Sequence, residues 1–165
     1  KLFYIYADYI GEICPDKIIY KLPEIESQIT SKSQLYMELF RQFKSILLIH
    51  GLQIEPLEVA TGQRIGEHLY SQFEYETLEQ LTELVKDKFN ELDLGQLKIS
   101  SFEPLILKNN GCHECFKLQY NISTCNVTKG ILKSIFESHF NREVSVEEVE
   151  CTSKYDDCCT FTVDY

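Results

Sequence analysis

The stretch 125–159, CNVTKGILKSIFESHFNREVSVEEVECTSKYDDCC, holds four of the chain's seven cysteines. Its first part has apolar residues at helical spacing, and its second part alternates as strands do. Cys125 then begins a helix, Cys151 ends a strand and Cys159 begins the next strand. A tight turn would bring Cys151 and Cys159 together, with the start of the helix above them. The three thiols are either small buried hydrophobic groups or ligands of one metal ion.

A fourth ligand for such a metal would come from the acidic strand. This strand offers three candidates, namely Glu147, Glu148 and Glu150. Glu148 and Cys151 have opposite parity, so a regular strand would point them to opposite faces. Both can bind one ion only if the strand ends or bulges between them.

The flanking sequence predicts an α+β fold. Helical periodicity indicates helices within 32–51, 55–73 and 76–95, and the first of these has an apolar stripe made of Leu35, Leu39, Phe43, Ile46 and Leu47. Residues 96–120 alternate like two strands around an Asn109-Asn110-Gly111 turn. The expected order is N-terminal helices and then β-β-α-β-β, with an antiparallel sheet of about four strands and helices packed on it. We expect residues 1–165 to form a single domain.

Composition limits the possible partners. The net charge of −10 argues against a nucleic-acid or anionic-membrane surface, because both require clustered Lys and Arg. No apolar run approaches the roughly 20 residues of a membrane span. We expect a soluble, cytoplasmic protein, in which seven cysteines indicate metal ligands or free thiols before disulfides.

The spacing of these residues resembles the 4-vinyl-reductase (hydrocarbon-binding) domain family. The similarity rests on Cys125, Gly130, the amphipathic helix, the VEC of 149–151 and Cys159. It is strongest to the phenol-sensing domains of aromatic-catabolism regulators and more distant to Golgi transport tethering subunits. The resemblance implies a zinc ion bound by Cys125, Glu148, Cys151 and Cys159, which would stabilise the half 96–165. Because four protein ligands leave no open position, this zinc would be structural.

The chain departs from the family between Cys151 and Cys159. The family usually has glycines in the loop before the last cysteine, whereas this chain has TSKYDD. This departure concerns the geometry of the loop and not the identity of the ligands.

A second cysteine motif, CHEC at 112–115, is expected on the tip of the 96–120 hairpin. A C-x-x-C pair can be half of a metal site or a redox pair, or its two thiols can be unrelated. No second C-x-x-C completes it, and only Cys14 and Cys158 are left over. We favour unrelated thiols here.

An aromatic-rich interior raises the possibility of a pocket for a small apolar or phenolic ligand. The candidate lining residues are Tyr70, Phe73, Tyr75, Phe102, Leu105 and Leu107. Ordinary core packing explains the same residues, and the resemblance to hydrocarbon-binding domains is the reason to single them out.

The sequence therefore favours a binding module over an enzyme. No nucleophile–base motif, dinucleotide fingerprint or phosphate-binding loop is present in it, so we assign no catalytic residue. We expect a small hydrophobic or aromatic ligand and a structural zinc. The resemblance also implies a homodimer, for which 1–30 is a possible dimerisation segment. The alternatives are a 4-vinyl reductase or tetrapyrrole carrier, and a protein-interaction subunit.

Overall fold

The computed structural model describes residues 31–165. The possible dimerisation segment 1–30, including Cys14, lies outside the described residues. From residue 31 onward the elements are α2 (Lys32–Ile49), α3 (Glu55–Tyr70), α4 (Leu78–Glu91), β1 (Gln96–Phe102), β2 (Leu105–Asn110), α5 (Asn126–Phe140), β3 (Ser145–Glu150), a short 3₁₀ turn (Thr152–Lys154) and β4 (Cys159–Asp164). This order confirms the predicted α+β plan of helices followed by β-β-α-β-β.

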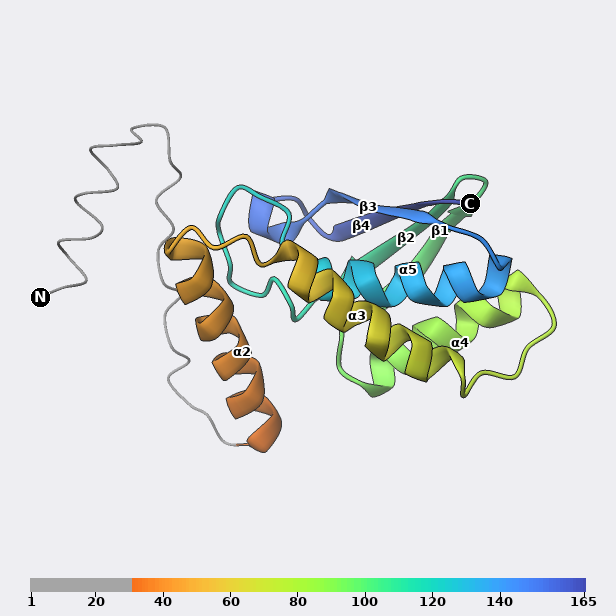
Figure 1. The fold of residues 1–165 in the computed structure, drawn as a ribbon, viewed down its shortest axis with the longest axis horizontal. Coiled ribbons are helices and arrows are strands. Elements are labelled where there is room, and N and C mark those ends of the chain that lie inside the picture. Colours follow the sequence, from red (N-terminus) through yellow and green to blue (C-terminus); the bar gives the residue numbers. More distant parts are fainter. Residues whose placement is uncertain (1–30) are drawn as a thin grey trace, which may run out of the picture.

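The four strands form one antiparallel sheet in the order β1-β2-β4-β3. Helix α4 contacts β1, α5 contacts β3, and α3 packs against α5. These three helices lie on one side of the sheet (Figure 1). The core between these layers is apolar and closed. Its fully buried members include Leu81, Val85, Phe89, Leu97, Leu105, Leu107, Ile131, Leu132, Ile135, Phe136, Phe161 and Val163.

The hairpin turn lies elsewhere than predicted. β1 and β2 are joined at Glu103–Pro104, whereas Asn109 and Asn110 are the last residues of β2. The buried Asn109 pairs with Cys159 in the sheet, and its side-chain amide donates to the Leu94 carbonyl at 3.0 Å. Gly111 does adopt the left-handed conformation that the motif signals, with φ of 62°. The chain then enters an irregular loop rather than a second strand, so CHEC follows β2 and is not at a hairpin tip.

Helices α3 and α5 approach each other at glycines. A Cβ atom on Gly62 would lie 2.1 Å from the carbonyl oxygen of Val127, and one on Gly130 would lie 2.2 Å from that of Val59. These contacts are with backbone, which cannot move aside as the end of a flexible side chain could. The close contact explains why α3 keeps glycine in its interior, where it costs about 1 kcal/mol relative to alanine.

Substitution of Gly62 tests this contact. Gly62→Ala improves helix propensity but forces the two backbones apart, so we expect a net loss of about 1–3 kcal/mol in the free energy of unfolding. Urea denaturation followed by circular dichroism measures it. Thr61→Ala, exposed on the same helix, is the matched control and should change stability by less than about 0.5 kcal/mol. A stabilised Gly62→Ala variant would contradict the packing described here.

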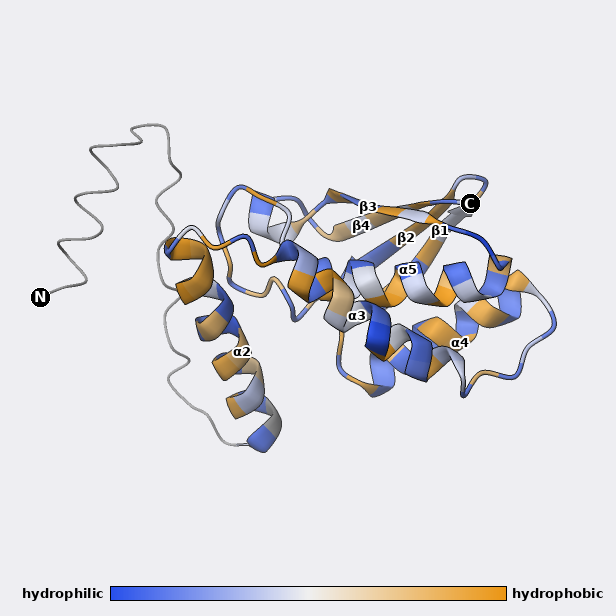
Figure 2. Cartoon of the chain, in the orientation of Figure 1, coloured by the Kyte–Doolittle hydropathy of each residue, from blue (hydrophilic) through white to orange (hydrophobic). Residues whose placement is uncertain are grey.

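Helix α2 presents its apolar stripe to solvent within the described part of the chain. Leu39 and Phe43 are 55% and 63% exposed, and hydrophobic residues recur along α2, which stands apart from the sheet (Figure 2). Its buried side is polar and contains Glu38, Arg41 and Lys44. Arg41 pairs with Glu38, and Lys44 pairs with Glu58 and Glu114, which permits their burial. The homodimer stays a prediction.

Among residues 31–165, no helix combines the length and apolar character needed to cross a bilayer.

Candidate metal centre

Five cysteine sulfurs converge at one end of the sheet. The Sγ of Cys125 lies 3.5 Å from that of Cys112, 3.6 Å from that of Cys159 and 3.8 Å from that of Cys151. The Sγ of Cys115 is 3.3 Å from that of Cys159. All five residues are buried and none forms a disulfide.

The predicted positions of three of these cysteines are confirmed. Cys125 is the N-cap of α5, Cys151 follows β3 and Cys159 begins β4. The backbone N–H of Cys151 donates to Asp156 Oδ2 at 2.8 Å, which fixes the turn after β3. The TSKYDD loop between Cys151 and Cys159 is therefore held in place by the carboxylate of Asp156, one of its own residues.

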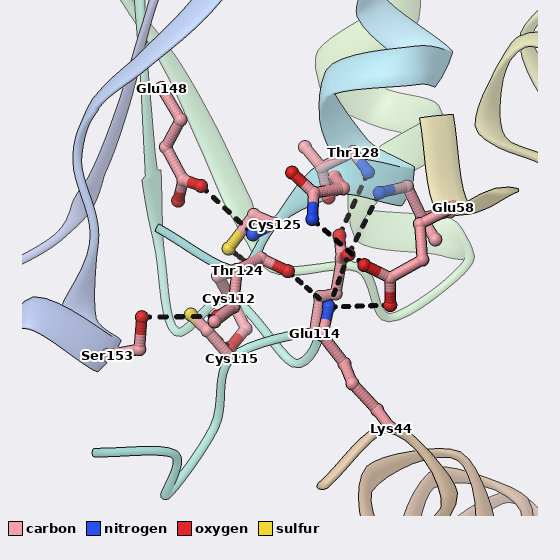
Figure 3. Close-up of polar contacts among 12 residues, drawn as sticks. Lys44, Glu58, Cys112, Glu114, Cys115, Thr124, Cys125, Thr128, Glu148 and Ser153 are labelled. Atoms are coloured by element: carbon pink, nitrogen blue, oxygen red, sulfur yellow. Dashed lines mark hydrogen bonds and ion pairs between the residues drawn. The ribbon is translucent and has the colours of Figure 1, made fainter. Parts of the chain in front are cut away.

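Glu148 is the acidic residue that faces the sulfurs. The β3–β4 pairing shifts register between Glu148 and Glu150, so Val149 is an extra residue in β3. This is the bulge that the opposite parity of Glu148 and Cys151 required. Glu148 Oε2 accepts from the N–H of Cys125 at 2.9 Å (Figure 3). Its Oε1 is buried and has no hydrogen-bond partner among the described residues.

The other two acidic candidates point elsewhere. Glu150 accepts from the hydroxyl of Thr160 and lies 4.0 Å from Lys108 Nζ. Glu147 is exposed to solvent. Among the three candidates, only Glu148 has an oxygen within 4.8 Å of the sulfurs of Cys125, Cys151 and Cys159.

Burial and mutual contact shift the pKa values of the candidate ligand groups strongly. Burial first, and then the charge of Cys151, raise the pKa of Glu148 to about 9. Contact with Cys115 raises the pKa of Cys151, but contacts with Cys125 and Cys159 outweigh it and lower the value to about 5. Burial raises the pKa of Cys125. Metal binding would therefore expel protons from Glu148 and Cys125, because only the deprotonated groups are ligands.

The spacing of the sulfurs fits a tetrahedral metal. Thiolates at 2.3 Å from one zinc ion lie about 3.8 Å apart, and the shortest sulfur–sulfur distances in the cluster run from 3.3 to 4.0 Å. A disulfide would require about 2.05 Å. Two overlapping ligand sets arise, Cys125–Glu148–Cys151–Cys159 and Cys112–Cys115–Cys125–Cys159. The donor set, thiolates with one carboxylate, suits zinc or another thiophilic ion.

The prediction that the CHEC cysteines are unrelated thiols is therefore wrong. Cys112 and Cys115 lie within the cluster and not apart from it. Their C-x-x-C spacing was the available signal, but nothing in the sequence placed the loop beside β4. Cys158 does lie outside the cluster, as expected, and its Sγ is 3.6 Å from Thr160 Oγ1.

A buried ion-pair network, which no sequence pattern indicated, adjoins the sulfurs. Lys44 Nζ lies 2.9 Å from Glu58 Oε1 and 3.1 Å from Glu114 Oε1, and it donates to the Thr124 carbonyl (Figure 3). Glu114, inside CHEC, accepts from two backbone N–H groups in the first turn of α5, where a carboxylate complements the helix dipole. Burial lowers the pKa of Lys44, but Glu114 and Glu58 outweigh it and raise the pKa, so Lys44 stays cationic.

Removal of this cation should be costly. Lys44→Met leaves Glu58 and Glu114 buried without their counter-charge, and we expect a loss of about 3–5 kcal/mol in the free energy of unfolding. Chemical denaturation measures it. Lys86→Met removes the more exposed Lys86–Glu83 pair and should cost at most about 1 kcal/mol. Equal effects of the two substitutions would contradict the role given to Lys44.

The residues of the predicted aromatic pocket lie in different surroundings. Leu105 and Leu107 are fully buried in the core, and Phe102 is 36% exposed at the end of β1. Tyr70 and Tyr75 do come together, with their hydroxyls 2.6 Å apart. An open groove near them has an acidic rim and is lined by Phe73, Glu74, Tyr75, Glu76, Glu79, Gln80, Glu83, Leu84 and Asp87.

A separate cavity of about 350 Å³ lies between α2, the α4–β1 connection and the CHEC loop. Its lining combines two apolar side chains with polar and charged ones. The lining residues are Ser31, Gln34, Met37, Glu38, Arg41, Asp93, His113 and Phe116.

Three solved structures have a fold similar to that of this chain. A vinyl-4-reductase family protein from Methanocaldococcus jannaschii matches over 99% of this chain and 94% of its own, with a TM-score of 0.57 and 21% identity. The phenol-responsive sensory domain of the transcription activator PoxR, solved with phenol, matches over 82% of this chain and 75% of its own (TM-score 0.64, 11% identity). An H-NOX protein from S. oneidensis in the Fe(II)NO ligation state matches over 98% and 96% (TM-score 0.53, 14% identity).

Two sequence relatives, both uncharacterized proteins of Methanocaldococcus jannaschii, extend the comparison. One is 28% identical over 159 residues, or 93% of this chain and 82% of the relative. The other is 26% identical over 133 residues, or 77% and 74%. No protein-family model matches the chain. The chain thus has the fold shared by the vinyl-4-reductase family protein and the PoxR sensory domain, which confirms the predicted resemblance at the level of the fold.

Proposed function

We propose that this chain is a non-catalytic module that binds or senses a small aromatic or hydrophobic molecule and that a structural zinc ion stabilises its fold. The observation that carries the metal half is the convergence of four buried ligand atoms, from Cys125, Glu148, Cys151 and Cys159, within 4.8 Å of one another. The fold of the phenol-responsive PoxR domain supports the ligand half.

The zinc ion would have a structural role. Four protein ligands complete its coordination and leave no position for water or substrate. The ligands come from the start of α5, the end of β3 and the start of β4, so one ion ties three elements together. The unpartnered Oε1 of Glu148 supplies the fourth donor without breaking an existing hydrogen bond.

The ligand would occupy the cavity beside α2. A volume of about 350 Å³ lies near the lower end of the range of small-molecule sites and suits a single aromatic ring. Met37 and Phe116 offer apolar contact, while His113 and Glu38 offer groups that can hydrogen-bond a hydroxyl. The mixed lining, with two apolar and six polar or charged residues, would hold a small ring that carries a polar group such as a phenol hydroxyl.

Zinc removal should unfold the C-terminal half. Structural zinc contributes on the order of 10 kcal/mol in small zinc domains, comparable to the whole stability of a typical domain. We expect a chelator to lower the Tm sharply and added zinc to restore it. Thermal denaturation followed by circular dichroism measures both. Cys151→Ser should lower the Tm before any chelator is added, whereas Cys158→Ser, outside the cluster, should behave as wild type.

Phenol binding should raise the Tm. At a phenol concentration of ten times Kd the stabilisation is about 1.4 kcal/mol, or about 3–6 °C for a chain of this size. We expect Phe116→Ala, which removes a ring from the cavity beside α2, to reduce the shift. Phe73→Ala, at the acidic groove, should retain it. The absence of a shift with phenol and with other single-ring aromatics, in zinc-loaded protein, would contradict the ligand class.

A further inference from the structure

Cys112 and Cys115 are not ligands in the zinc site proposed above, yet they complete a second set of four. Cys112 Sγ lies 3.5 Å from Cys125 Sγ, and Cys115 Sγ lies 3.3 Å from Cys159 Sγ. All four sulfurs lie within 4.8 Å of one another and all four residues are buried. We infer that the cluster binds two metal ions, which share Cys125 and Cys159 as bridging thiolates, with Cys112 and Cys115 completing an all-thiolate position. This inference rests on the first zinc site of the proposed function.

The ligand count agrees with two metals. Two four-coordinate ions need eight coordination positions, and six ligands provide them when two of the six bridge. The two candidate sets have Cys125 and Cys159 in common and no other member. The bridging pair is separated by 3.6 Å, close to the edge of a thiolate tetrahedron, so two tetrahedra can meet at that edge.

A second cation would compensate the charge of two further thiolates. Five thiolates and one carboxylate would carry six negative charges in a buried site, and one zinc ion would balance two of them. The neighbouring cation Lys44 is already engaged by Glu58 and Glu114. Because buried charge without compensation is costly, a second divalent ion allows Cys112 and Cys115 to bind as thiolates. The hydroxyl of Thr152, 2.9 Å from Cys115 Sγ, is placed to donate to such a thiolate.

The loop that carries Cys112 and Cys115 needs an anchor. The chain between β2 and α5 contains neither helix nor strand, and loops of this length are uncommon in compact domains unless they have a function. A metal bound at Cys112 and Cys115 fixes this loop against β4 and α5. It also holds Glu114, between the two cysteines, where it caps α5 and pairs with Lys44.

The sulfur–sulfur distances also indicate the kind of metal centre. In an iron–sulfur cluster the cysteines are distributed over different irons, so not all four lie as close together as ligands of one ion. The distances of 3.3 to 3.6 Å match thiolates that share single ions. Tetrahedral sulfur coordination of single ions is typical of zinc.

Native mass spectrometry of the zinc-loaded chain, checked by elemental analysis, tests the inference. We expect two zinc ions per wild-type chain, and one in the double variant Cys112→Ser/Cys115→Ser. Cys151→Ser should also lose one ion, from the other position. Cys158→Ser is the matched control, since it removes a buried thiol outside the cluster, and it should keep two. Zinc X-ray absorption of wild-type protein, which does not depend on any variant folding, should show sulfur-dominated coordination and a zinc neighbour.

The possible failures are distinguishable. One ion per wild-type chain, lost in Cys151→Ser and kept in Cys112→Ser/Cys115→Ser, would overturn the second position and leave the proposed zinc site intact. One ion with the opposite dependence would overturn both the shared cluster and the proposed ligand set. Folded protein without metal would overturn the two metal proposals together. Iron with acid-labile sulfide would overturn the zinc assignment at both positions.

Discussion

The arrangement of the C-terminal half depends on the convergence of five buried thiols and one carboxylate. The elements from β2 to β4 begin or end beside this cluster: the loop after β2 contributes Cys112 and Cys115, α5 begins at Cys125, β3 leads into Cys151 and β4 starts at Cys159. Without a counter-charge these groups would repel one another when deprotonated, whereas a bound metal ion would coordinate them and offset the repulsion. The core between sheet and helices is apolar, and the cluster closes its end.

The CHEC loop joins this cluster to the rest of the molecule. Cys112 and Cys115 face the sulfurs, whereas His113 and Phe116 line the cavity beside α2. Glu114 caps α5 and pairs with Lys44 of α2. A single short segment therefore contacts the metal centre, the proposed ligand site and the helix that stands apart from the sheet. The proposed ligand site and the proposed metal site are therefore connected directly through the CHEC loop.

The helices pack through two different kinds of contact. α3 and α5 approach until their backbones touch at Gly62 and Gly130, so their contact is set by the absence of side chains. α2 instead buries Lys44 and Arg41 in pairs with carboxylates and exposes its apolar stripe within the described chain. Hydrophobic periodicity located all three helices, but it did not indicate which side of α2 would be buried, because paired charges can be buried too.

The sequence by itself determined the order of elements, the positions of Cys125, Cys151 and Cys159 at the ends of elements, and the need for a bulge beside Glu148. These follow from local periodicity and from the alternation of side chains along a strand. The tertiary structure alone decided that β2 runs through Asn109 and Asn110, that Cys112 and Cys115 join the other thiols, and that Lys44 meets Glu58 and Glu114. Those contacts join residues far apart in the chain, and their partners become neighbours only when the sheet and helices pack together.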